Sequence, residues 1–266
     1  MDNRPIGFFD SGLGGLTSVQ ELHEKLPNEK VLYFGDTART PYGSKSPETI
    51  RNFATQIVDY LVSKDCKMII IACNTVTAMA LESLRERYPD IPILGVIEPT
   101  VRRVTADGCN SIGVIATKAT IGSDVYGEKL REQNPDVSVK SLACPALVPL
   151  IEEGFVEGDI IELAIKHYMD DFINNGDFDS LILGCTHYPL LTKLFEKLYP
   201  GIRLYSSSAE VVNEAAEILK EKDMLADSND YQDRYYASDL SDNFIAMTEY
   251  LFKNRDSRIK LKKLED

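Results

Sequence analysis

The sequence has no apolar run long enough to cross a bilayer, and it has few basic residues for its acidic content. Its 266 residues include 29 Lys and Arg against 42 Asp and Glu, which gives a net charge of −13. Because nonspecific binding to nucleic acid or to an anionic membrane needs a positive surface, this charge disfavours both partners. Residues 1–6 lack the basic and then apolar layout of a signal peptide. We therefore expect a cytoplasmic protein with no membrane span.

Close Cys-x-x-Cys pairs are also missing, although the chain contains five cysteines. Cysteines of a cytosolic protein are kept reduced, so we expect no disulfides. Cys66, Cys109 and Cys144 have no polar motif beside a strand end. Buried free cysteine commonly behaves as a small hydrophobic residue, and we interpret these three as packing residues.

Apolar runs alternate with helical patterns along the whole chain, without low-complexity segments or long linkers. We expect strands near residues 5–9, 31–34, 68–72, 92–96, 111–115, 137–142, 180–183 and 202–205. This alternation predicts parallel sheets with helices on both faces. Beyond them we expect a serine-capped helix to about residue 222, an exposed loop over 223–232, a helix over 242–253 and a basic end at 258–263. These last elements are expected to return to the first lobe.

Two segments share one pattern, in which a strand of buried type ends in a small residue and a cysteine. They are residues 69–75 and 181–187, and their cysteines lie 112 residues apart. A fainter echo relates residues 6–12 to residues 112–118, at an offset of 106. Ligands of α/β sheets bind beyond the carboxyl ends of the strands. The repeats therefore predict two similar α/β lobes whose cysteines face each other across one cleft.

A cysteine that acts as a base must be a thiolate, and a thiol with a pKa of about 8.5 is only a few per cent ionised at neutral pH. A helix N-terminus after each strand would lower the pKa of Cys73 and of Cys185. Thr75, Thr186 or His187 could add hydrogen bonds. Buried packing is the alternative for either cysteine alone. Their shared setting favours a pair of catalytic thiols, which suits a reaction with two equivalent faces.

Other polar segments also follow predicted strands. Asp10 ends the first strand, where this architecture places catalytic groups, and begins a glycine-rich loop at 10–16. That loop could bind an anion through its N–H groups, but its spacing matches neither nucleotide pattern. The loop at 35–46 is rich in hydroxyls and charges and favours binding, with a surface turn as the alternative. Glu152 and Glu153 could enter the cleft, although the residues alone favour a solvated acidic pair.

His187 lies two residues after Cys185 and is one of three histidines in the chain. A Cys-x-His pair could form half of a zinc site. The other ligands would then come from Cys73, Asp10 or Glu152 without a usual spacing, so we expect acid–base chemistry and no metal. A loop histidine bonded to backbone is the alternative.

Together these motifs resemble the cofactor-independent aspartate/glutamate racemase family. The resemblance covers nearly the whole chain and rests on residues 6–17, 33–43, 72–75, 95–99 and 183–191. One departure is Val76-Thr77, where smaller residues are usual, and it could alter packing beside the pocket. The family implies two flavodoxin-like α/β domains with the active site in the cleft between them. We expect the first to comprise residues 1–98 plus 208–266, and the second residues 99–207.

The resemblance also implies racemisation of glutamate without pyridoxal phosphate or any other cofactor, to supply D-glutamate for peptidoglycan. Cys185 would act on L-glutamate and Cys73 on D-glutamate, each thiolate removing the α-proton while the opposite thiol donates one. Asp10 would assist Cys73 and His187 would assist Cys185, with Glu152 as a further helper. The family implies substrate contacts for Asp10, Ser11, Tyr42, Gly43, Asn74, Thr75, Thr117, Thr120, Thr186 and His187. It further implies a homodimer.

Three other functions remain open at this point. Two opposed thiols do not themselves select a side chain, so a racemase of aspartate or another amino acid is the nearest alternative. A noncatalytic binding or regulatory protein on the same fold is the second, although intact cysteines on both sides argue against it. The third is a hydrolase that uses Cys185 with His187 as base. It would not need Cys73, so activity surviving in Cys73→Ala would identify it.

Overall fold

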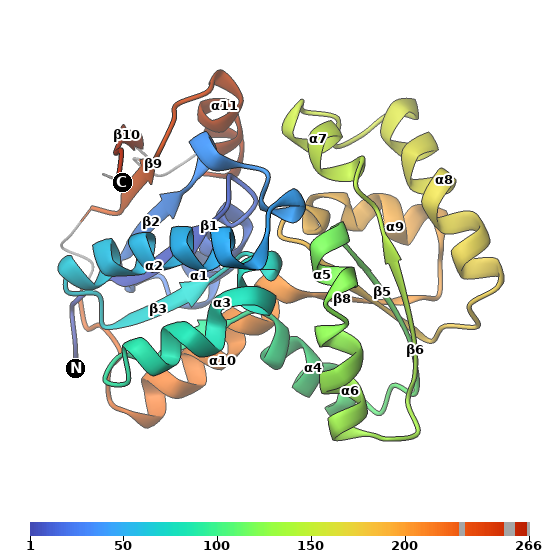
Figure 1. The fold of residues 1–266 in the computed structure, drawn as a ribbon, viewed down its shortest axis with the longest axis horizontal. Helices are drawn as coiled ribbons and strands as arrows, with labels where there is room; N and C mark the ends of the chain where they lie inside the picture. The colour runs from blue at the N-terminus through green and yellow to red at the C-terminus, as the bar shows by residue number, and fades with distance from the viewer. Residues whose placement is uncertain (229–231, 253–258, 265–266) are drawn as a thin grey trace.

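The computed structural model describes residues 1–228, 232–252 and 259–264, whose strands form two parallel sheets. The first sheet, in the order β10-β9-β2-β1-β3-β4, comprises β1 (Ile6–Asp10), β2 (Val31–Gly35), β3 (Met68–Ile71), β4 (Ile93–Gly95), β9 (Arg234–Ala237) and β10 (Ile259–Leu261). The second, in the order β6-β5-β7-β8, comprises β5 (Ser111–Ala116), β6 (Ser138–Ala143), β7 (Ser180–Gly184) and β8 (Arg203–Ser206). Figure 1 shows the two lobes side by side, and the expected parallel α/β fold is confirmed.

Helices cover both faces of the sheets, and none of those described is long and apolar enough to cross a bilayer. The first lobe contains α1 (Leu16–Lys25), α2 (Pro47–Ser63), α3 (Asn74–Arg87), α10 (Ser207–Glu221) and α11 (Asp242–Leu251), with 3₁₀ turns η1 (Thr37–Arg39) and η2 (Tyr42–Ser44). The second contains α4 (Ile97–Ala106), α5 (Lys118–Gly122), α6 (Val125–Gln133), α7 (Leu147–Glu152), α8 (Asp159–Asn174), α9 (Thr192–Leu198) and η3 (Tyr188–Leu191). Helices α4 and α10 pack against each other where the lobes meet.

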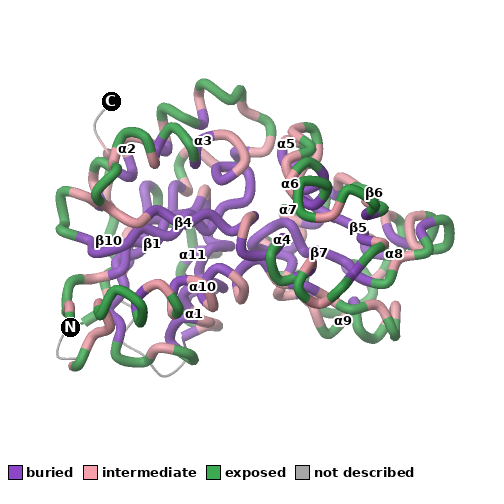
Figure 2. Tube along the Cα trace, turned by 90° about the horizontal axis from the view of Figure 1, so that it is seen from below, coloured by how far each residue is buried: buried purple, intermediate pink, exposed green. Residues whose placement is uncertain are grey.

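The strands are buried because helices cover both faces, as an apolar parallel sheet requires. The side chains of successive residues of β1 point to opposite faces of the sheet. Phe8 belongs to the core that includes residues of α1 and α10, whereas Phe9 belongs to the core that includes residues of α2 and α3. Figure 2 shows buried strands inside and exposed helix surfaces outside. Strand β6 is largely exposed or half-buried because it forms the edge of its sheet.

The two lobes share a strand order and a register. Strands β2-β1-β3-β4 and β6-β5-β7-β8 occupy equivalent places in their sheets. Ile6 pairs with Met68 in the first, and Ile112 pairs with Ser180 in the second. These pairs are related by the same offsets, 106 and 112 residues, that relate the repeated segments of the sequence. The register therefore agrees with the internal duplication predicted from those segments.

The C-terminal part returns to the first lobe as expected, but it contains two strands that the sequence analysis missed. Strand β9 pairs with β2, β10 pairs with β9, and α11 packs on α1. The basic end predicted at 258–263 thus includes a short edge strand. The serine-capped helix is confirmed as α10, whose N-cap Ser206 accepts a hydrogen bond from the N–H of Ala209. Residues 229–231, 253 and 258, which belong to the predicted loop, last helix and basic end, lie outside the described residues.

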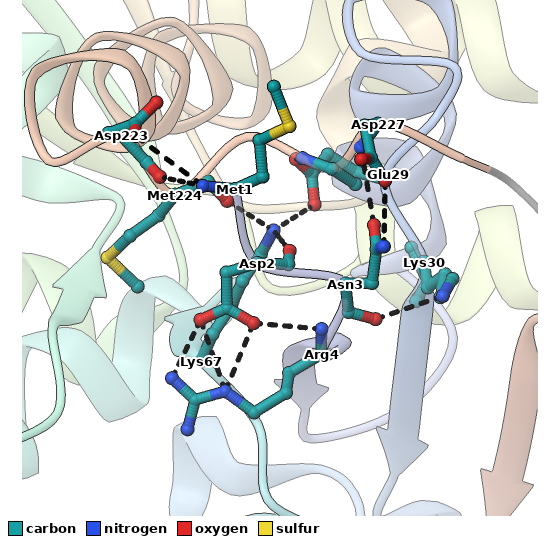
Figure 3. A network of polar contacts seen from close by, with 12 residues as sticks. Met1, Asp2, Asn3, Arg4, Glu29, Lys30, Lys67, Asp223, Met224 and Asp227 are labelled. Atoms are coloured by element: carbon teal, nitrogen blue, oxygen red, sulfur yellow. Dashed lines mark hydrogen bonds and ion pairs between the residues drawn. The ribbon is translucent and has the colours of Figure 1, made fainter.

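A buried ion pair between Lys67 and Glu29 fastens the amino ends of the first sheet (Figure 3). The Nζ atom of Lys67 lies 2.6 Å from Oε2 of Glu29, and both side chains are buried. The same ammonium group donates hydrogen bonds of 2.6 Å to the carbonyls of Asp2 and Met224. One charged group therefore joins the segment before β1, the segment before β2 and the segment after α10.

Candidate active site

The carboxyl ends of both sheets border one cavity of about 40 Å³ between the lobes. Its walls come from the loops after β1, β2, β3, β5 and β7, together with the start of α7. The lining residues are Ser11, Thr40, Pro41, Tyr42, Gly43, Cys73, Asn74, Thr75, Thr117, Val148, Cys185, Thr186 and His187. The structure therefore brings both cysteines to one pocket. Asp10, Thr120 and Glu152 lie behind this wall and contact its residues.

Cys73 is the N-cap of α3, two residues after the end of β3, and its side chain is buried. Its Sγ atom lies 3.5 Å from Oγ of Ser11. Burial and the nearby Asp10 raise the pKa of Cys73 to about 12, although hydrogen bonds from Ser11 and from the N–H of Val76 act in the opposite direction. Val76 belongs to the first turn of α3, so the helix N-terminus does act to lower this pKa, but the expected net lowering is wrong because desolvation outweighs it. At neutral pH Cys73 is a thiol that can donate a proton.

Cys185 has a different neighbour, the imidazole of His187. Nδ1 of His187 lies 3.7 Å from Sγ of Cys185, and Nε2 of the same ring lies 3.1 Å from Oε1 of Glu152. Burial alone would lower the pKa of His187, but Cys185 and Glu152 raise it to about 10. The ring therefore carries a positive charge at neutral pH, which stabilises negative charge on the sulfur beside it.

Glu152 is the last residue of α7, a short helix formed by the apolar stretch that precedes the two glutamates. Its contact with the buried His187 makes the solvated-pair interpretation wrong for Glu152. Glu153, the next residue, is exposed as that interpretation expects.

Asp10 lies behind the cavity wall and contacts groups of both lobes. Its carboxylate accepts a 3.0 Å hydrogen bond from the N–H of Gly12 and one of 3.4 Å from the hydroxyl of Thr186. Burial raises the pKa of Asp10, and the positive His187 opposes this shift. The glycine-rich loop lies close to His187 of the second lobe, and only glycine fits there, because a Cβ atom at Gly14 would lie 2.6 Å from Nδ1 of His187. The loop is therefore shaped by close packing between the lobes.

Hydroxyl and amide groups close the cavity from the α3 side. Oγ1 of Thr75 lies 3.1 Å from that of Thr117 and 3.3 Å from that of Thr120. The side chain of Asn74 is held at both ends, since it donates to Ser207 and accepts from Tyr126. The contacts with Thr117, Thr120 and Tyr126 connect the first lobe to the second across the site.

Comparison with known proteins identifies the family. The Asp/Glu/Hydantoin racemase family matches residues 16–215. A glutamate racemase of Neisseria meningitidis serogroup C is 42% identical over 248 residues, which cover 92% of each chain. The chain belongs to the Asp/Glu/hydantoin racemase family. The crystal structure of glutamate racemase from Francisella tularensis, in complex with D-glutamate, has a TM-score of 0.93 and 40% identity over 100% of this chain and 99% of the other.

The Val76-Thr77 departure lies outside the cavity of this racemase-family member. Val76 is fully buried, and neither residue lines the pocket. The hydroxyl of Thr77 donates a 2.9 Å hydrogen bond to the carbonyl of Cys73. The same side chain packs against Gly95 at the end of β4. The Val76-Thr77 departure therefore affects the packing of α3 against β4.

The sequence analysis did not single out Thr40, Pro41 and Val148, which line the cavity, or Tyr126 and Ser207, which hold Asn74. Thr40 and Pro41 belong to the polar loop at 35–46, whose composition favoured binding. Val148 gave no signal, because an apolar residue in an apolar stretch is indistinguishable from core. Among the described residues, no group of three or more His, Cys, Asp and Glu side chains is arranged to hold a metal ion.

Proposed function

We propose that the protein interconverts L- and D-glutamate by a two-thiol mechanism that uses its own side chains. The observation that carries the proposal is that Cys73 and Cys185 line one cavity with different polar neighbours. The substrate is supported by the names of the relatives and by the D-glutamate bound to the Francisella protein.

In the L-to-D direction, the thiolate of Cys185 removes the α-proton of L-glutamate. The thiol of Cys73 donates its own proton to the opposite face of the α-carbon. One C–H bond breaks and one forms, so the reaction leaves Cys185 as a thiol and Cys73 as a thiolate. The D-to-L direction uses the same pair with the roles exchanged.

The polar neighbours of the cysteines support this assignment of roles. The raised pKa of Cys73, about 12, keeps its proton available for donation. The raised pKa of His187, about 10, keeps a positive charge beside Cys185, where a thiolate is needed. Glu152 holds that charge in place through its contact with Nε2 of the ring. Asp10 assists at Cys73, where its negative charge favours return of the proton to the sulfur.

The α-carbon of an amino acid is a weak acid, so the site must stabilise the charge that develops there. Each 1.36 kcal/mol of such stabilisation gives about a tenfold rate increase. We propose that the substrate contacts are made by polar side chains and backbone groups in the cavity wall and directly behind it. They are Asp10, Ser11, Tyr42, Gly43, Asn74, Thr75, Thr117, Thr120, Thr186 and His187.

Substrate binding requires the cavity to widen. Its volume of about 40 Å³ has room for only about three water molecules at roughly 10–15 Å³ each, which is too little for the heavy atoms of glutamate. We propose that the lobes separate as two domains, residues 1–98 plus 208–266 and residues 99–207. Membership of the two sheets supports this division. The contact between Thr75 and Thr117 crosses it and would have to break.

The family resemblance also supports a cellular role. We propose that the enzyme works in the cytoplasm as a homodimer and supplies D-glutamate for peptidoglycan.

Proton NMR of L-glutamate in D₂O tests the reaction, with optical rotation recorded in parallel. We expect the α-proton signal and the rotation to decay together, with no added pyridoxal phosphate or metal. At early times deuterium should appear in D-glutamate before it appears in recovered L-glutamate, because the donated proton comes from a solvent-exchanged thiol. Unchanged signals with glutamate would contradict the proposal, and aspartate would be the next substrate to test.

A cysteine hydrolase is the second candidate, because Glu152, His187 and Cys185 form a chain of acid, imidazole and thiol. The Cys73→Ala variant separates the two. Racemisation is lost in this variant under the two-thiol proposal, whereas a hydrolase keeps its activity.

A further inference from the structure

The loop between β2 and α2 forms one wall of the cavity. We call residues 36–45 the substrate loop, since it presents Tyr42 and Gly43 to the cavity. Gly43 lies close to the second lobe, where a Cβ atom would be 3.1 Å from Cβ of Thr117. The position of this loop therefore decides the shape of the pocket.

Asp36 holds the substrate loop from inside the first lobe. Its side chain is fully buried, and Oδ2 accepts hydrogen bonds from the hydroxyl of Tyr42 and, at 2.7 Å, from Nε of Arg39. Burial and the Asp36 carboxylate raise the pKa of Tyr42, so its hydroxyl stays protonated and donates. The carboxylate thus sets where Tyr42 lies.

Ser238 contacts the other oxygen of this carboxylate. Its hydroxyl donates a 2.8 Å hydrogen bond to Oδ1 of Asp36 and accepts one of 2.9 Å from the N–H of Ala38. Its own N–H donates to the carbonyl of Gly35 at 3.0 Å. Ser238 is only 7% exposed and directly follows β9. The hydroxyl of Ser238 therefore contacts both the carboxylate of Asp36 and the backbone of the substrate loop.

We propose that Ser238 is a positioning residue for racemisation, acting through Asp36 on Tyr42. Loss of its hydroxyl removes a donor from a buried carboxylate and an acceptor from the N–H of Ala38. The carboxylate of Asp36 is fully buried, and a buried charge that loses a hydrogen-bond donor is strongly disfavoured, so the loop shifts to recover one. Tyr42 and Gly43 then leave the geometry in which they contact the substrate. The kinetic part of this inference rests on the proposed function.

Steady-state kinetics of Ser238→Ala with both glutamate enantiomers provide the first test. We expect KM to rise about tenfold, the effect of one lost hydrogen bond to a buried charge, with kcat changed by less than about threefold. Ser238→Thr retains the hydroxyl and should restore a KM near that of the unchanged protein. A KM that stays at the wild-type value in Ser238→Ala would overturn the proposal.

Hydrogen–deuterium exchange without substrate provides a second test that does not depend on the substrate's identity. We expect the amides of residues 37–45 to exchange faster in Ser238→Ala, while those of β3 keep their rate. Ser241→Ala is the matched control, because Ser241 caps α11 three residues further on by accepting from the N–H of Phe244. It should loosen the C-terminal segment without changing KM.

The two tests separate failure of this inference from failure of the proposed function. If the unchanged protein does not racemise glutamate, exchange of the substrate loop still decides the role of Ser238. Equal exchange in Ser238→Ala and the unchanged protein, or an equal rise in KM in Ser241→Ala, would contradict it.

Discussion

Nδ1 of His187 lies 3.7 Å from Sγ of Cys185, and the other nitrogen of the ring contacts Glu152. Cys73 has no such cation among its hydrogen-bonding neighbours in the described structure, where Ser11 lies beside its sulfur and Asp10 close behind. The two thiols are equally buried, with 5% of Cys73 and 6% of Cys185 exposed. They therefore differ in charge environment more than in access.

This difference predicts which cysteine is alkylated first. At pH 7.5, iodoacetamide should modify Cys185 well before Cys73, because the positive ring of His187 lies 3.7 Å from the sulfur of Cys185, whereas the pKa of Cys73 is about 12. Peptide mass spectrometry over a time course measures both rates. The rate at Cys73 should rise about tenfold per pH unit between pH 8 and 10, as its thiolate fraction does. Faster modification of Cys73 at neutral pH would contradict the prediction.

Replacing either thiol with a hydroxyl should abolish racemisation. We expect Cys73→Ser and Cys185→Ser each to lose at least about a thousandfold in kcat, because an alcohol is a far weaker acid and base than a thiol. Polarimetry with each enantiomer measures the loss, and circular dichroism checks the fold. Full activity in either variant would contradict the two-thiol mechanism. Cys66→Ser is a control at a buried cysteine far from the cavity.

The contact between Glu152 and His187 predicts a shift in pH dependence. His187 carries its charge below its raised pKa of about 10, so kcat/KM for L-glutamate should fall as pH rises through that value. Glu152→Gln removes a negative charge that raises this pKa, and the fall should therefore begin at lower pH. Glu153→Gln changes an exposed neighbour and should leave the profile in place. Identical profiles for both variants would refute a role of Glu152 through His187.

The Lys67–Glu29 pair predicts a loss of stability without a change in catalysis. Lys67→Met leaves Glu29 as a buried charge without its cation, which should lower the free energy of unfolding by about 3 to 5 kcal/mol. Urea unfolding measures the difference. The double variant Glu29→Gln with Lys67→Met should recover part of it, and Lys64→Met, at an exposed site nearby, should change it by less than about 0.5 kcal/mol. KM should not change, because the pair lies at the amino ends of the strands.

The sequence alone determined the parallel α/β fold, the two equivalent lobes and the strand ends that carry Cys73 and Cys185. Apolar runs of strand length and helical periodicity are local patterns, and parallel sheets place the carboxyl ends of their strands together. Strand β9 escaped detection because its four residues, Arg-Tyr-Tyr-Ala, show no apolar run, and only pairing with β2 makes them a strand.

Only the tertiary structure decided the electrostatics and the supports of the site. The pKa of Cys73 depends on how completely other segments exclude water from its sulfur, and no local motif records that exclusion. Glu152 reaches His187, and Ser238 reaches Asp36, across 35 and 202 residues of chain. Short-range patterns specify which groups stand at the strand ends. Desolvation and long-range contacts decide what charge those groups carry and how firmly they are held.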